Sequence, residues 1–342
     1  MLNEFKARIM HCRHGECRLG HRMKMWSEDL CWLMHAVFPI ILICTSLPHL
    51  ARGQCVPPGS TPGLRELVLG RCTEYQATVN PAQLCDNDQQ RKNCTEITDK
   101  FVAAFSYQPA CNVTFGRYDN FIKSAHGDVS RGKAMFWSDV YGVVQRYTYR
   151  GRRAIAIEDT LIGYIGDGLR FCAQDHSPGI TYNQECPGFD QTEGCPYNAE
   201  FSFWAMASSN FASSASGEVN LMLNASLAEA FYNTSFFGVW ELPNLNSSKV
   251  TKVTVLLVHI PGQTVRSKCS TENIASLQRR LRERNIASDC VDGPRGPQAM
   301  LCVDYPDEEE CKVRASTSGA SLNSDAVMGL AICICVISFV LS

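Results

Sequence analysis

Residues 250–260, Val-Thr-Lys-Val-Thr-Val-Leu-Leu-Val-His-Ile, decide the fold class of this chain. The run is rich in β-branched residues and Pro261-Gly262 follows it directly, which is typical of a buried strand that ends in a turn. Residues 274–284 then place apolar residues at helical spacing, and residues 299–303 favour a second short strand. Strand, helix and strand in this order predict a parallel pair of strands joined by a crossover helix.

The first half of the folded region is typical of helices instead. Residues 96–107 place Ile97, Phe101, Ala104 and Phe105 on one face, at spacings of three and four, and residues 115–125 are a weaker candidate. We therefore expect an α+β fold. A helical N-terminal lobe would be joined to a small α/β C-terminal lobe with a parallel sheet.

The composition limits the class of protein. The chain has 342 residues, of which 45% are hydrophobic and 19% charged, so it can bury a core in one large domain or two smaller ones. The formal net charge of -2 makes nucleic acid an unfavourable partner. Neither a P-loop nor a Rossmann glycine motif is present, which excludes the two common nucleotide-phosphate loops.

Cysteine usage indicates a secreted, disulfide-rich domain. Of 18 cysteines, 12 lie between Cys55 and Cys311, and their even number predicts six disulfides. No Cys-x-x-Cys pair occurs among these 12, so we expect no zinc or other metal site. Five Asn-x-Ser/Thr acceptor sites support passage through an oxidising secretory compartment: Asn93, Asn112, Asn224, Asn233 and Asn246.

The two ends of the chain predict secretion and membrane attachment. Residues 1–53 form a basic and then apolar leader, either a signal peptide cleaved near Gly53 or an uncleaved signal anchor. Residues 316–325 are typical of a flexible stalk, and residues 326–342 form an apolar tail, either a GPI-attachment signal or a plain membrane anchor. The domain, residues 54–315, would then face the extracellular space or the lumen of secretory vesicles.

Acids and tryptophans are the residues that could carry chemistry. Glu158 and Asp159 interrupt an apolar run, where a carboxylate is costly unless it is paired or used, although a helix N-terminus would also accommodate them. Glu218 and Glu241 could each be a surface acid. Three aromatic clusters, each compatible with ordinary packing when considered alone, lie around Trp137, Trp204 and Trp240.

Taken together, these segments resemble the ADP-ribosyl cyclase / NAD glycohydrolase family (cyclic ADP-ribose hydrolases). The resemblance runs from about Arg71 to Cys311 and implies an active site in the cleft between the two lobes. The matching segments occur in one consistent order: Gly70-Arg71-Cys72, Phe136-Trp137-Ser138, Glu158-Asp159-Thr160-Leu161, Gly163-Tyr164, Phe203-Trp204 with Ser208, and Phe236-Phe237-Gly238 to Glu241-Leu242-Pro243-Asn244-Leu245.

The resemblance assigns roles to these residues. It implies that Glu241, not Glu218, is the catalytic carboxylate and that Glu158 is a second active-site acid at the nicotinamide end. The remaining positions would bind substrate: the aromatic walls Trp137 and Trp204, the phosphate or ribose contacts Ser138 and Ser208, and the further acid Asp167.

The chemistry of NAD fits these residue types. Nicotinamide leaves as a neutral base, so no general acid is needed, and one ionised carboxylate can stabilise the oxocarbenium-like ribose covalently or as an ion pair. Water then gives ADP-ribose, whereas adenine N1 of the same molecule gives cyclic ADP-ribose. Phe236 stands where cyclising family members carry Phe, so we predict substantial cyclase activity. Glu158 fits either product.

The resemblance also pairs ten cysteines and completes the expected function. Cys55 and Cys85 are left over, and we expect them to pair. NAD would be the substrate with no separate cofactor, and the scaffold allows a homodimer. The alternative is a catalytically silent receptor or adhesion domain, which the presence of Glu241, Trp137 and Trp204 disfavours. The implied pairs are Cys72–Cys94, Cys111–Cys195, Cys172–Cys186, Cys269–Cys290 and Cys302–Cys311.

Overall fold

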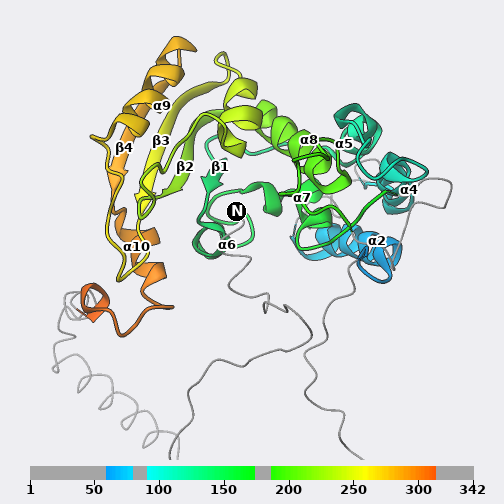
Figure 1. The fold of residues 1–342 in the computed structure, drawn as a ribbon, viewed down its shortest axis with the longest axis horizontal. Helices are drawn as coiled ribbons and strands as arrows, with labels where there is room; N and C mark the ends of the chain where they lie inside the picture. Colours follow the sequence, from blue (N-terminus) through cyan, green and yellow to red (C-terminus); the bar gives the residue numbers. More distant parts are fainter. Residues whose placement is uncertain (1–58, 80–90, 174–185, 313–342) are drawn as a thin grey trace, which may run out of the picture.

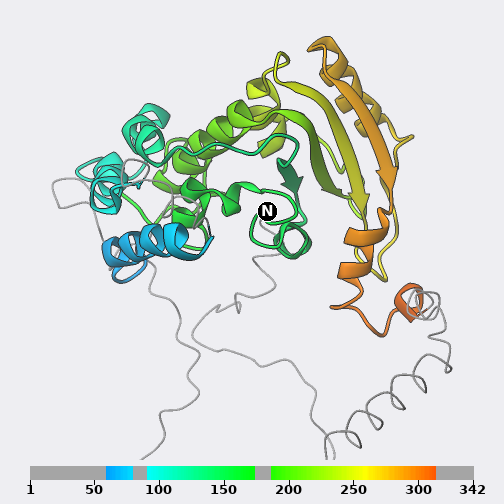
Figure 2. The same cartoon turned by 180° about the vertical axis from the view of Figure 1, so that it is seen from behind.

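The computed structural model describes residues 59–79, 91–173 and 186–312. Figures 1 and 2 show a helical part and a sheet side by side, with α8 running between them and β4 at the far edge of the sheet. The main helices of the helical part are α2 (Leu64–Glu74), α4 (Cys94–Phe105), α5 (Asp119–Ala125), α7 (Leu161–Gly166) and α8 (Ala199–Ser214). The α/β part contains β1 (Met135–Ser138), α6 (Tyr141–Thr148), β2 (Gly217–Asn224), β3 (Val250–Val258), α9 (Glu272–Glu283), β4 (Ala287–Asp292) and α10 (Arg295–Leu301).

The predicted helix at residues 96–107 is confirmed as α4. It begins after Asn93, whose side chain accepts a hydrogen bond from the N–H of Glu96, and it ends before Ser106. The predicted apolar face is buried, and the fully buried ring of Phe101 contacts four others, those of Phe105, Phe121, Phe171 and Phe203. Edge-to-face ring pairs of this kind form the core of the helical part.

The four strands form a parallel sheet in the order β1-β2-β3-β4, which confirms the predicted fold class. β3 is the strand predicted from residues 250–260, and α9 is the crossover helix between β3 and β4. Both faces of such a sheet are covered, and the last four residues of β3 are all buried.

The strand predicted at residues 299–303 is wrong. These residues lie in and after α10, and the parallel partner of β3 is β4. β4 is an edge strand whose residues are exposed or half-buried, so it lacks the apolar run by which a strand is detected in a sequence. Pro294 and Pro297 suit the beginning of a helix, and Leu301 supplies its buried side.

Among the described residues there are five disulfides, with the pairing that the family resemblance implies. Cys55 and Cys85, the leader, the stalk and the tail lie outside the described residues. Within the described part, no helix is long and apolar enough to cross a membrane, and no group of His, Cys, Asp and Glu side chains could hold a metal ion.

One of the five predicted glycan acceptors is buried, which argues against a glycan there. Asn224, at the end of β2, is 8% exposed. Its Nδ2 donates to the carbonyl of Asp139 at 3.4 Å, and its Oδ1 accepts from the N–H of Ser226 at 2.9 Å. A glycan on this amide nitrogen would break the first contact and would have no room. The other four acceptors are exposed.

Candidate active site

Trp137 and Ser138 are the last two residues of β1, at the carboxyl edge of the parallel sheet. Ligands of open parallel sheets bind outside this edge. The Trp137 ring is buried, with 6% exposed, and Ser138 donates from Oγ to Asp139 Oδ2 at 3.0 Å. The structure therefore places two of the predicted substrate-binding residues at the carboxyl edge of the sheet.

Glu158 lies against Trp137. It belongs to a 3-10 turn, η3 (Ile157–Asp159), and is 6% exposed. Its Oε2 accepts hydrogen bonds from Trp137 Nε1 and from Gln145 Nε2, both at 3.2 Å. Burial, followed by the charge of Asp167, raises the pKa of Glu158 to about 8.

Asp159 has a different role from its neighbour. Its Oδ2 accepts from the N–H of Ala156 at 2.9 Å, so it stabilises the turn locally. The helix that follows, α7, is capped by Thr160, whose Oγ1 accepts from the N–H of Gly163. The alternative that these two acids mark a helix N-terminus therefore fits Asp159, which accepts a backbone hydrogen bond at the start of η3. It does not explain Glu158.

Gly163 allows α7 to pack on this turn. A Cβ at this position would lie 2.0 Å from the carbonyl oxygen of Ile157 and 2.9 Å from Cα of Glu158. Any other residue would have to displace the backbone that carries Glu158. The glycine in the matching Gly163-Tyr164 segment is therefore required by packing.

Tyr141 connects Asp167 to the same group. Its hydroxyl donates to Asp167 Oδ2 at 2.8 Å, and its ring lies 5.5 Å from that of Trp137. Burial raises the pKa of Asp167, whereas the hydrogen bond from Tyr141 and the charge of Arg71 lower it. The sequence interpretation missed Tyr141 and Gln145, although they stand four residues apart on α6 directly after β1 and so share one face of that helix.

Glu241 ends a short π-helix, η4 (Phe237–Glu241), and is 6% exposed. Its Oε1 accepts a hydrogen bond from the hydroxyl of Ser208 at 3.1 Å. Burial raises the pKa of Glu241 to about 8, and the Ser208 hydroxyl opposes part of this shift. π-Helical turns often mark functional sites. Gly238 is needed in this one, because a Cβ there would lie 2.6 Å from the carbonyl oxygen of Asn233.

Trp204 and Phe236 are half-buried. Trp204 lies on α8 one turn before Ser208, so both project from the same side of that helix. Phe236 precedes η4, and its ring contacts those of Phe189, Phe201 and Trp240. Glu218 is exposed and pairs with Lys252 at 2.9 Å, as expected for a surface acid.

Glu158 and Glu241 are thus both buried carboxylates, and they hydrogen-bond different neighbours. Glu158 comes from the segment between α6 and α7, and Glu241 comes from the segment between β2 and β3. Buried acids with raised pKa values and aromatic neighbours are typical of functional sites. An ionised carboxylate in such a place attracts a cationic substrate far more strongly than one in water does.

Comparisons with known proteins identify relatives over most of this chain. A family model described as ADP-ribosyl cyclase matches residues 61–311. The ADP-ribosyl cyclase/cyclic ADP-ribose hydrolase of Aplysia californica is 36% identical over 280 residues, which cover 81% of this chain and 96% of that protein. ADP-ribosyl cyclase/cyclic ADP-ribose hydrolase 2 of Homo sapiens is 32% identical and covers 78% of this chain and 81% of that protein.

Solved structures match as well. Aplysia cyclase in complex with the substrate NGD and the product cGDPR has a TM-score of 0.65 and 36% identity, and the match covers 74% of this chain and 98% of that one. The apo structure of porcine CD38 has a TM-score of 0.60 and 33% identity, with 69% and 98% covered. The likeness therefore extends through both the helical part and the sheet.

Proposed function

The chain belongs to the ADP-ribosyl cyclase family, and we propose from this premise that it is an enzyme that cleaves the nicotinamide–ribose bond of NAD. The products are nicotinamide together with cyclic ADP-ribose, ADP-ribose or both. The observation that supports this most directly is the burial of Glu241 beside the neutral hydroxyl of Ser208. A carboxylate in this setting can counter the positive charge of a substrate.

Glu241 stabilises the ribose as the bond breaks. The nicotinamide of NAD is a cationic pyridinium and leaves as a neutral base, so positive charge moves to the ribose. An ionised carboxylate facing the anomeric carbon stabilises this charge covalently or as an ion pair. In the free protein burial raises the pKa of Glu241 to about 8, and an adjacent cationic ring would lower it again. Substrate binding therefore favours the reactive carboxylate.

Glu158 holds the nicotinamide end. Trp137 and Gln145 both donate to Oε2, which fixes the carboxyl group where it can accept from the carboxamide N–H of the substrate. Trp137 and Trp204 form flat apolar walls for the rings, while Ser138, Ser208 and Asp167 contact the more polar parts. NAD is the substrate, and we propose no separate cofactor.

Phe236 directs the ribosyl intermediate towards the cyclic product. An aromatic surface lets the adenine fold back and limits the access of water, so that adenine N1 competes as the nucleophile. The two outcomes differ only in which nucleophile reaches the same carbon, and cyclic ADP-ribose should form a substantial share of the product.

We also propose that the domain acts on the extracellular side of the plasma membrane or in a secretory lumen. Five disulfides and four exposed glycan acceptors support an oxidising compartment. Attachment through the apolar tail, preferably by a GPI anchor, and a homodimer remain predictions.

The test is product analysis of the secreted domain, residues 54–315, with NAD. Wild type and the surface control Glu218→Gln should release nicotinamide, whereas Glu241→Gln should lose nearly all release. Phe236→Thr should keep the release but lower the cyclic-to-linear product ratio. A folded, disulfide-intact wild type that releases no nicotinamide would contradict the enzyme and favour a silent receptor domain.

A further inference from the structure

We infer that Phe189, held in place by Glu200, positions Phe236 and so sets the partition between cyclic and linear product. This inference rests on the proposed function and adds a specificity-determining contact outside the two carboxylates. Phe189 lies in an irregular segment before α8, far in sequence from η4. Loss of this contact would change the ratio of cyclic to linear product and not the rate of bond cleavage.

The contact between the two rings is direct. The ring centroids of Phe189 and Phe236 are 5.0 Å apart. The other two rings that contact Phe236 are more distant from it, Phe201 at 5.8 Å and Trp240 at 6.4 Å. Phe201 belongs to α8 and Trp240 to η4, so regular structure orders both of them. Phe189 lacks such support and needs other contacts to stay against Phe236.

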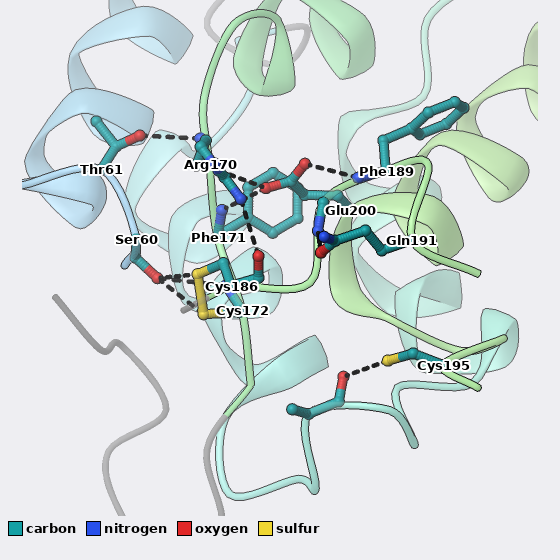
Figure 3. Close-up of a disulfide and its surroundings, with 12 residues drawn as sticks. Ser60, Thr61, Arg170, Phe171, Cys172, Cys186, Phe189, Gln191, Cys195 and Glu200 are labelled. Carbon is teal, nitrogen blue, oxygen red and sulfur yellow. Dashed lines mark hydrogen bonds and ion pairs between the residues drawn. A yellow bond between two sulfur atoms is a disulfide. The ribbon is translucent and has the colours of Figure 1, made fainter. Parts of the chain in front are cut away.

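Glu200 supplies this support, as Figure 3 shows. It lies in the first turn of α8 and is 7% exposed. Its Oε2 accepts from the N–H of Phe189 at 3.3 Å, and its Oε1 accepts from the N–H of Phe171 at 3.2 Å. One buried carboxyl therefore joins the backbone of Phe189 to the backbone of Phe171 in the segment beside it.

The same segment is fixed on its other side. Cys186 forms a disulfide with Cys172, and its carbonyl accepts from an Nη of Arg170 at 2.8 Å. The Nε of Arg170 lies 3.7 Å from Oε1 of Glu200, so the guanidinium also offsets the charge of that acid. Gly188 donates from its N–H to Gln191 Oε1 at 2.8 Å. The segment 186–191, which carries Phe189, is thus held by the disulfide of Cys186 and by hydrogen bonds to Arg170 and Glu200.

The packing of Phe189 on Phe236 affects which product forms. Adenine must stack on Phe236 before water reaches the intermediate, and a ring that can rotate gives a poorer stacking surface. Glu241 accepts its hydrogen bond from Ser208, whereas the Phe189 ring packs on those of Phe201 and Phe236, so loss of Phe189 should spare bond cleavage. Loss of one aromatic pair should lower the cyclic-to-linear ratio about threefold to tenfold.

The experiment uses the full chain expressed in a secretory cell line and incubated with NAD. We would compare wild type with Phe189→Leu, Phe189→Tyr, Glu200→Gln and the matched control Phe115→Leu. Phe115 is also half-buried, but among the described residues its ring pairs with those of Tyr197, Phe201 and Trp240 and not with that of Phe236. Nicotinamide release, product ratio and melting temperature would be measured for each.

We expect Phe189→Leu and Glu200→Gln to lower the ratio at least threefold while nicotinamide release stays within about twofold of wild type. Phe189→Tyr, which retains the ring, should restore the ratio, and Phe115→Leu should leave it unchanged. Should Phe189→Leu fail to fold, Phe189→Met, whose unbranched side chain adapts to irregular gaps, carries the same expectation. An unchanged ratio in the folded variants, an equal fall in Phe115→Leu, or a wild type that makes only linear product would overturn the inference. A folded wild type without nicotinamide release would instead refute the proposed function.

Discussion

Replacing Glu241 by Gln should remove activity and yet stabilise the protein at alkaline pH. The folded state raises the pKa of this carboxyl from 4.5 to about 8 because burial disfavours its charged form. The protonated acid is therefore favoured by folding. The stability that it contributes is fully present below about pH 4.5 and is lost as the pH rises through about 8. Glutamine has nearly the same shape and cannot ionise.

The size of the effect follows from the two pKa values. Each pKa unit corresponds to about 1.4 kcal/mol, so the shift sets an upper limit of about 5 kcal/mol at pH above 9. Water that enters the site when the acid ionises reduces this figure. The two pKa values imply that wild type has already lost about 2 kcal/mol at pH 6 relative to its stability below pH 4.5, so we expect the stability advantage of Glu241→Gln to grow by a further ~2 kcal/mol between pH 6 and pH 9.

The assay is urea denaturation followed by tryptophan fluorescence at pH 6, 7, 8 and 9, with disulfides intact. Glu158 is unchanged in both proteins, so its own pH dependence cancels. Glu218→Gln, at an exposed ion pair with Lys252, serves as the control and should follow wild type within about 1 kcal/mol throughout. If wild type and Glu241→Gln lose equal stability between pH 6 and pH 9, Glu241 is not a buried acid with a raised pKa, and the argument fails.

Three further predictions test single contacts. Ser208→Ala removes the hydrogen-bond donor that lowers the pKa of Glu241, so the pH at which kcat/KM reaches half its maximum should rise by about one unit. An unshifted pH profile would show that the hydrogen bond is absent. Gly163→Ala places a Cβ 2.0 Å from the carbonyl oxygen of Ile157, so the melting temperature and nicotinamide release should both fall, and a variant equal to wild type in both would contradict that packing. Asn224→Gln should leave the mass of the secreted glycoprotein unchanged, whereas the same change at each exposed acceptor should remove the mass of one glycan. A loss of mass in Asn224→Gln would show that Asn224 carries a glycan after all.

Local patterns in the sequence predicted the elements that have a repeating apolar face. The face of α4 and the run of β3 are visible in the sequence because burial imposes a spacing of three to four on a helix and apolar continuity on a covered strand. The sequence does not reveal β4, because an edge strand needs no apolar run. It suggests a strand where α10 lies, because the few apolar residues of α10 are not distinctive at that length.

The site shows a similar division. The matching segments around Trp137, Glu158 and Glu241 pointed to the family and to NAD. Residues that act through contacts with these, such as Tyr141 and Gln145, carry no motif of their own, because a phenol or an amide becomes informative only once its neighbour is known.

By itself, the sequence determined the fold class, the disulfide-rich character, and the residues that define the family. Tertiary structure alone decided that Asn224 is enclosed, that Gly163 and Gly238 are required by close backbone contacts, and that Glu200 holds Phe189 against Phe236. The physical reason is that periodicity and residue type are local properties, whereas burial, pKa and ring contacts depend on segments that meet only when the chain has folded.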